Sequence, residues 1–145
     1  TTPISGKLQQ KKEVPAIIAA HGIGYVTTAS AAYPLDLYDK IKKAKSLQGP
    51  KYIHVHTPCP AGWGFDPRYT VKIGKLAVET GLFDLYEIED SKFQLTGQSK
   101  KLRGKKLKPV TDYFKTQSRF RVLTEERIDE IQQQIDAKWD EYNSV

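Results

Sequence analysis

The sequence has little sulfur: it contains one cysteine and no methionine in 145 residues. One cysteine cannot form an internal disulfide, which excludes a disulfide-stapled secreted domain and favours a protein of the reducing cytoplasm. The sequence also lacks the apolar run of about 18 residues that a transmembrane helix needs, and no signal peptide is visible at its start. We therefore expect a cytoplasmic domain without a membrane partner. The missing methionine leads us to expect that Thr1 is not the native first residue.

The net charge of +6 is concentrated in one part of the sequence. Residues 99–121 contain nine lysines or arginines and a single acidic residue, Asp112. Tyr113, Phe114 and Phe120 lie in the same stretch, and cations next to aromatic rings are typical of surfaces that bind phosphates and bases. A solvated face, or a docking surface for an acidic protein, would have the same composition. Composition leaves these alternatives open.

The first half of the sequence predicts a strand, a helix and a second strand in succession. Residues rich in β-branched and aromatic side chains at 25–30 and 51–57 indicate the two strands. Between them, Pro34 begins a helix with an apolar face, and Gly49 follows its end. A short apolar helix is expected at 16–20. A strand–helix–strand unit of this kind favours a parallel pair joined by a right-handed crossover.

The chain after the second strand predicts a helix followed by a hairpin. The helix begins at Asp66 and Pro67, which are typical of a helix start, and ends before Gly81. Residues 82–89 and 92–95 are predicted to be the two strands of the hairpin.

The C-terminal part predicts helical structure after a basic connection. Residues 97–108 are expected to be irregular, and residues 109–116 to contain a short helix. Thr124 is the predicted cap of a final helix. The apolar stripe of this helix consists of Ile128, Ile131, Ile135, Trp139 and Tyr142.

Two parallel strands are too few for a stable sheet, because parallel strands normally lie buried in a larger sheet with helices on both faces. The sequence therefore predicts an α/β fold that is half of a doubly wound domain, followed by a hairpin and a helical C-terminal extension. We expect residues 1–81 to be the C-terminal part of the domain and residues 82–145 to be the extension. The N-terminal part of the sheet would come from outside the chain.

The single cysteine, Cys59, lies in a Pro-Cys-Pro turn directly after the second predicted strand. Loops after strands are where α/β proteins usually hold their reactive groups. One thiolate cannot hold a metal or a cluster, so Cys59 is either an inert thiol or shares a site with ligands from outside the chain. His54 and His56 alternate with Val55 and thus share one strand face. We favour a packed pair over a metal-binding pair, because no third ligand has a useful spacing; no role follows for His21.

Several segments, in order along the chain, resemble a known family. They are Ala19-Ala-His-Gly-Ile-Gly-Tyr-Val26, Ala32-Tyr-Pro34, Gly49-Pro50, His54-Val-His-Thr-Pro-Cys-Pro-Ala-Gly-Trp63, Ile73-Gly-Lys-Leu-Ala-Val-Glu-Thr-Gly81, Leu85-Tyr-Glu87 in the predicted hairpin, and Lys108-Pro-Val with Gln117-Ser-Arg-Phe120. Each segment has little specificity, but the ordered set resembles the β subunit of pyruvate:ferredoxin oxidoreductase (pyruvate synthase). The family's β subunit is longer, and the chain is similar to its C-terminal half.

The resemblance implies a thiamine diphosphate-binding fold and oxidative decarboxylation of a 2-oxo acid to an acyl-coenzyme A. Mg²⁺ would hold the diphosphate, and electrons would pass through [4Fe-4S] clusters to ferredoxin. In the family, four cysteines hold the cluster nearest to thiamine diphosphate, and one of them lies in a Pro-Cys-Pro segment, so the resemblance implies that Cys59 is one cluster ligand. Thr1 and Thr2 are implied neighbours of the diphosphate, with ordinary loop threonines as the alternative.

We therefore expect part of the β subunit of a 2-oxo acid:ferredoxin oxidoreductase, with pyruvate as the substrate and 2-oxoisovalerate or oxalate as alternatives. The expected partners are the N-terminal half of the same subunit, the α, γ and δ subunits, ferredoxin, coenzyme A and the 2-oxo acid. The basic run at 100–108 would guide acidic ferredoxin or contact another subunit. The chain alone is expected to be inactive. A basic module that binds RNA or DNA, which we favour less, and a purely structural fragment are the competing hypotheses.

Overall fold

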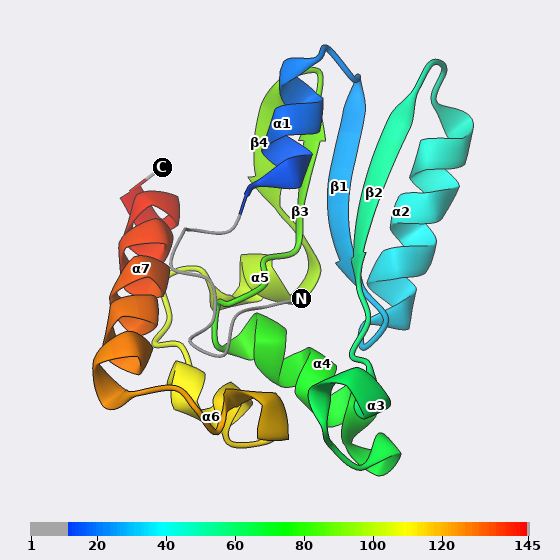
Figure 1. The fold of residues 1–145 in the computed structure, drawn as a ribbon. Coiled ribbons are helices and arrows are strands. Elements are labelled where there is room, and N and C mark those ends of the chain that lie inside the picture. Colours follow the sequence, from blue (N-terminus) through cyan, green and yellow to red (C-terminus); the bar gives the residue numbers. More distant parts are fainter. Residues whose placement is uncertain (1–11, 145) are drawn as a thin grey trace.

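A computed structural model describes residues 12–144 and has a four-stranded mixed sheet at its centre (Figure 1). The strands are β1 (Tyr25–Ser30), β2 (Lys51–His56), β3 (Tyr86–Glu89) and β4 (Lys92–Leu95), in the spatial order β2-β1-β3-β4. β1 and β2 are parallel, whereas β3 pairs antiparallel with both β1 and β4. The predicted α/β class is confirmed.

The parallel pair is the predicted strand–helix–strand unit. Helix α2 (Pro34–Ser46) connects β1 to β2, and the register runs from Tyr25 opposite Lys51 to Ser30 opposite His56. Helix α1 (Val14–Ala20) contacts both strands. Every residue of β1 is buried, so both faces of this strand are covered, as in a doubly wound domain.

The predicted hairpin is present, but its first strand is shorter than expected. Asp90 and Ser91 both have positive φ, 47° and 65°, as a tight turn that matches the twist of the strands requires. The strand begins at Tyr86 instead of residue 82. The amide of Phe83 donates to the Ala77 carbonyl at the end of a helix, at 2.9 Å, so this stretch closes the helix and does not join the ladder.

Short helices surround the lower end of the sheet in Figure 1. They are α3 (Pro60–Trp63), the 3₁₀ turn η1 (Pro67–Tyr69), α4 (Thr70–Glu79), α5 (Gly97–Leu102), α6 (Val110–Phe114) and the 3₁₀ turn η2 (Ser118–Phe120). The long helix α7 (Glu125–Ser144) follows them and lies at the left of Figure 1.

The expectation that residues 97–108 are irregular was wrong for their first part, which forms α5. Buried Ser99 anchors this helix to the chain before β3, because its hydroxyl accepts a hydrogen bond from the Leu85 amide at 2.8 Å. Nothing in this polar stretch of the sequence indicated that the Ser99 side chain would satisfy the buried Leu85 amide. The predicted cap at Thr124 is confirmed, since its hydroxyl accepts from the Arg127 amide at 3.3 Å.

A hydrophobic core joins α4, α6 and α7. Its buried members are Ile73, Leu76, Ala77, Val110, Tyr113, Phe114, Ile135 and Trp139. The predicted stripe of α7 faces this core, with Ile135 and Trp139 buried and Ile128, Ile131 and Tyr142 packed at its edge. The Trp139 indole donates to the Gly81 carbonyl at 3.3 Å. The boundary between residues 81 and 82 stays a prediction, although the hairpin after it shares the sheet of β1.

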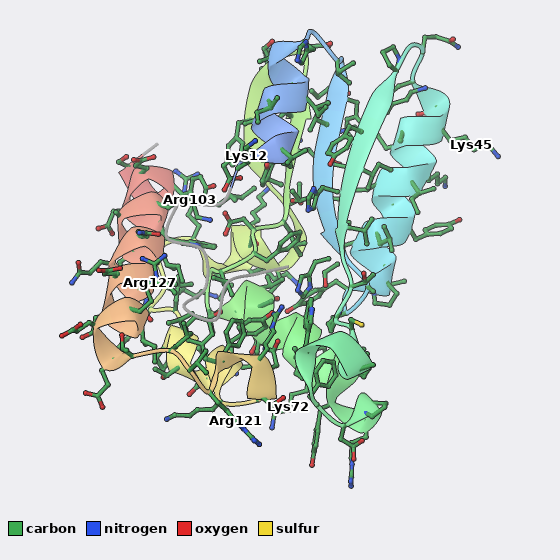
Figure 2. All side chains as sticks on the ribbon, in the orientation of Figure 1. Lys12, Lys45, Lys72, Arg103, Arg121 and Arg127 are labelled. Atoms are coloured by element: carbon green, nitrogen blue, oxygen red, sulfur yellow. The ribbon has the colours of Figure 1, made fainter. Side chains whose placement is uncertain are left out.

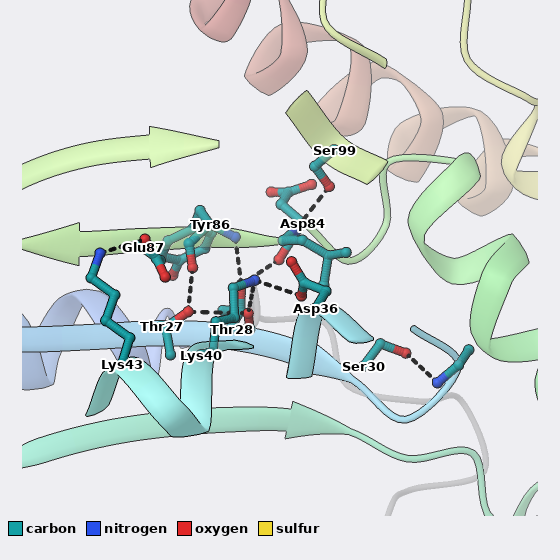
Figure 3. Close-up of polar contacts among 12 residues, drawn as sticks. Thr27, Thr28, Ser30, Asp36, Lys40, Lys43, Asp84, Tyr86, Glu87 and Ser99 are labelled. Carbon is teal, nitrogen blue, oxygen red and sulfur yellow. Dashed lines mark hydrogen bonds and ion pairs between the residues drawn. The ribbon is translucent and has the colours of Figure 1, made fainter. Parts of the chain in front are cut away.

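Polar side chains connect this helical core to the sheet. The Thr28 hydroxyl on β1 donates to the Asp84 carbonyl at 2.6 Å and accepts from the Tyr86 amide at 2.9 Å (Figure 3). The Asp84 carboxylate in turn pairs with Lys138 of α7 at 2.6 Å and accepts from the Tyr142 hydroxyl at 3.2 Å. Burial raises the pKa of Asp84, and Lys138 opposes this shift. The last helix is therefore fixed to the sheet through one nearly buried carboxylate.

A second buried ion pair holds α2 on the sheet. The Lys40 ammonium, 3% exposed, donates to the Thr28 carbonyl at 2.8 Å and to Asp36 at 2.7 Å (Figure 3). Burial lowers the pKa of Lys40, and the hydrogen bond to Asp36 opposes this change. On the same side, Lys43 bridges Glu87 and Glu89, at 2.9 Å each.

Within residues 12–144, none of the helices combines the length and the apolar character that crossing a membrane requires.

We predict that Lys138→Met destabilises the chain by about 2 kcal/mol at pH 7, because it leaves the buried Asp84 carboxylate without its cation. The value is discounted from that of a fully buried pair, since Lys138 is 34% exposed. Burial already raises the pKa of Asp84, so the unpaired group will protonate readily and the loss will shrink as the pH falls toward about 4. Urea unfolding between pH 4 and 7 measures this dependence.

The matched control is the double variant Asp84→Asn/Lys138→Met, which removes both charges. It should be more stable than Lys138→Met at pH 7 and should show less dependence on pH. Equal losses for Lys138→Met at pH 4 and 7 would contradict the assigned role of the ion pair.

Candidate functional site

Cys59 lies in the turn directly after β2, at the carboxyl end of the parallel pair. Its thiol is exposed, and its carbonyl accepts a hydrogen bond from the Trp63 amide at 2.9 Å. Its sulfur accepts a longer hydrogen bond from the Gly62 amide at 3.4 Å. A Cβ atom at Gly62 would lie 3.2 Å from this sulfur, so glycine leaves the amide free to approach it closely.

This geometry suits a thiolate that binds a metal cluster. The sulfur is accessible from outside, and an amide that donates to a ligating sulfur stabilises its negative charge. Among residues 12–144 no group of three or more histidine, cysteine or acidic side chains could hold a metal ion. A cluster at Cys59 would therefore take its other ligands from outside the described residues.

The turn that follows Cys59 is closed by a segment far away in the sequence. Gly64 has φ 68°, and its carbonyl accepts a hydrogen bond from the Ser118 amide at 3.1 Å. A Cβ atom at Gly64 would overlap the Ser118 hydroxyl. Both the left-handed backbone and the close approach of the chain therefore require glycine at this position.

An aromatic cluster connects the turn to β2. The Trp63 ring lies 5.7 Å from the His56 ring, which lies 4.9 Å from Phe83. The His54 ring is 6.1 Å from Phe83, and the Tyr52 hydroxyl contacts His54 Nδ1 at 3.1 Å. The two histidines therefore share one strand face, as predicted, and both pack against aromatic rings.

The remaining residues singled out in the sequence lie elsewhere. His21 is exposed at the end of α1. Thr1 and Thr2 lie outside the described residues, so their proximity to a diphosphate stays a prediction.

Arg119 is the residue that the sequence did not reveal as part of this site. Its guanidinium carbon lies 3.8 Å from the centre of the Trp63 ring and 4.4 Å from that of Phe120. The same group donates to the Tyr113 hydroxyl at 3.1 Å and to the Gln117 side chain at 3.0 Å. The available signal was the Gln-Ser-Arg-Phe segment, but nothing in it indicated a partner more than fifty residues earlier.

Comparison with known proteins gives close relatives. The chain is 51% identical over 132 residues to the pyruvate synthase subunit PorB of Methanothermobacter marburgensis, covering 91% of the chain and 44% of that protein. It is 50% identical over 135 residues to PorB of Methanocaldococcus jannaschii, covering 93% and 44%. It is 39% identical over 132 residues to the ketoisovalerate oxidoreductase subunit VorB of Pyrococcus abyssi, covering 91% and 42%.

The chain spans less than half the length of these relatives, and no protein-family model matches it. The match nevertheless extends through 91% of the chain, which includes the strand pair and the Cys59 turn. The chain thus belongs to the family of PorB-type β subunits, as the C-terminal part of such a subunit.

Proposed function

We propose that the chain is part of the β subunit of a 2-oxo acid:ferredoxin oxidoreductase that oxidatively decarboxylates pyruvate to acetyl-coenzyme A. The identity of 51% to a pyruvate synthase subunit carries this proposal. The relative named as a ketoisovalerate oxidoreductase subunit is more distant, at 39%, which favours pyruvate over 2-oxoisovalerate. Neither relative is named for oxalate, which remains the third alternative.

The chain's own contribution is to place one sulfur, that of Cys59, at the carboxyl end of the parallel strands. Cys59 would hold a [4Fe-4S] cluster together with three cysteines from the preceding part of the subunit, and Thr1 and Thr2 would lie near the diphosphate of thiamine diphosphate and its Mg²⁺. When bound, thiamine diphosphate would supply the carbanion chemistry and the cluster would accept the electrons. The Gly62 amide supports the ligand role of Cys59, since it already donates to the sulfur. With one of four cluster ligands, the chain alone would be inactive.

The other partners are proposed on physical grounds. Lys100, Lys101, Arg103, Lys105, Lys106 and Lys108 are exposed around α5 and the loop after it. Such a surface attracts acidic proteins such as ferredoxin, or an acidic face of another subunit, α, γ or δ. The nucleic-acid alternative demands steeply salt-dependent binding to RNA or DNA. No binding at low salt would end it, and the kinship to oxidoreductase subunits favours the first proposal.

The free edge of β2 supports the preceding part of the subunit as a partner. Among the described strands, β2 pairs only with β1. The His56 carbonyl accepts from the Ala31 amide on the β1 side, at 3.0 Å. Since backbone groups alternate in direction along a strand, the amides of Ile53 and Val55 point to the free edge. A parallel strand with an open edge is normally completed by another strand.

Replacing Cys59 by alanine in the assembled oxidoreductase should remove one cluster, which is the loss of about four iron atoms per β subunit. Iron analysis and the electron paramagnetic resonance (EPR) spectrum of the reduced enzyme measure this. Thr57→Ala is the matched control, because Thr57 is exposed in the same turn and carries no sulfur. Unchanged iron content in Cys59→Ala would refute the ligand assignment.

We also predict that Val55→Pro abolishes association with the preceding part of the subunit, because proline removes an edge amide without removing a hydrogen bond to β1. Val55→Thr keeps the amide and should associate normally. Co-purification of the chain with the tagged remaining part of a PorB relative, expressed as a separate polypeptide, measures the association. Equal recovery of the two variants would show that the other part binds elsewhere.

A further inference from the structure

The segment from Gln117 to Phe120 combines a buried glutamine and a phenylalanine packed against the core with an exposed arginine. Its flanking residues Tyr113 and Phe114 are buried in the core, but Arg119 itself is exposed. Its guanidinium turns back over the ring of Trp63, the last residue of α3. The segment thus contacts the turn that follows Cys59, although it belongs to neither strand of the parallel pair.

Two independent contacts fix the turn to this segment. The first is the stacking of the Arg119 guanidinium on Trp63, at 3.8 Å from the ring centre. The second is the hydrogen bond from the Ser118 amide to the Gly64 carbonyl, at 3.1 Å. One contact holds a side chain and the other holds the backbone, so together they restrain both the rotation and the position of the turn.

The orientation of the guanidinium is itself fixed. It donates through Nη2 to the Tyr113 hydroxyl and through Nε to Gln117 Oε1. The side-chain Nε2 of Gln117 donates to the Tyr113 carbonyl at 3.1 Å, and this bond fixes the Gln117 Oε1 that accepts from Arg119. A planar group with several donors is needed to stack and donate in two directions, and lysine offers only a point charge.

The restraint continues from Trp63 to Cys59. The Trp63 amide donates to the Cys59 carbonyl at 2.9 Å, and the Gly62 amide between them donates to the Cys59 sulfur. Trp63 also packs against His56, the last residue of β2, with the ring centres 5.7 Å apart. A change in the position of Trp63 would therefore change the backbone that carries the sulfur and the amide that donates to it.

We propose that Arg119 is a positioning residue, which acts through Trp63 to hold the Cys59 sulfur and the Gly62 amide in the geometry that a cluster ligand needs. This inference rests on the proposed ligand role of Cys59. It assigns a role to the Gln-Ser-Arg-Phe segment, which the proposed function leaves without one.

The test uses the assembled oxidoreductase with Arg119→Leu, which removes the cation and its donors, and Arg119→Lys, which retains the charge alone. Arg121→Leu is the matched control, because Arg121 is exposed two residues later and its side chain points away from the fold (Figure 2). Hydrogen exchange followed by mass spectrometry measures the exchange rate of the amides in the peptide 57–65. The EPR spectrum reports the environment of the reduced cluster.

Arg119→Leu should accelerate exchange in residues 60–65 by about tenfold, while exchange in β1 and α4 stays unchanged. Its EPR signal should be broadened or shifted at undiminished iron content. Arg119→Lys should lie between Arg119→Leu and the unmodified enzyme, and Arg121→Leu should match the latter. Gly64→Ala, which breaks the second contact, should reproduce the exchange effect.

Unchanged exchange in residues 60–65 would overturn the proposal, as would acceleration spread evenly over the subunit, which indicates general destabilisation. Faster exchange with an unaltered EPR signal would also overturn it, because the turn would then move without consequence for the cluster. The ligand role fails separately, through full iron content in Cys59→Ala.

Discussion

The hydrogen bonding of β1 to two neighbours is the constraint on which the rest of the structure depends. β1 is parallel to β2 on one side and antiparallel to β3 on the other. Because β1 and β2 are parallel, the turn after β1 and the turn with Cys59 lie at the same end of the sheet, where both strands have their carboxyl ends. The antiparallel side brings Asp84 and Tyr86 next to Thr28, and through Asp84 the long helix α7 is fixed to the sheet.

Helix α4 packs closely against the carboxyl ends of the parallel strands. A Cβ atom at Gly74 would lie 2.6 Å from that of Ala32, in the turn after β1. The helix therefore approaches the ends of the strands at a distance that only glycine permits. Through α4, the helical core is therefore packed directly against the end of the sheet that carries the Cys59 turn.

Local patterns in the sequence were sufficient for most of the fold. The strands of the parallel pair, the hairpin turn at Asp90 and Ser91, and the stripe of α7 each follow from periodicity or turn chemistry over a few residues. Helix α5 was missed because its polar residues show no apolar face, and the buried bond of Ser99 depends on a backbone group fourteen residues away.

The site divides in the same way. The position of Cys59 after a strand and the shared face of His54 and His56 could be read from the sequence, because both depend on adjacent residues. The contact of Arg119 with Trp63 could not, since it exists only when two distant segments meet in the folded chain. A pattern can name an arginine near aromatic residues, but packing decides which ring it covers.

Within residues 12–144 the outer edge of β2 pairs with no other strand, and this has a consequence for how such a chain can exist in a cell. Unpaired backbone groups along a strand can pair with other extended peptides as well as with the intended one, and proteins usually protect such edges with charge, proline or a covering element. Within β2 the only charged residue is Lys51, at its start, and Val55 is 40% exposed. A chain with this edge uncovered is open to self-association, so the proposed pairing with the preceding part of the subunit would protect it from aggregation as much as complete its sheet.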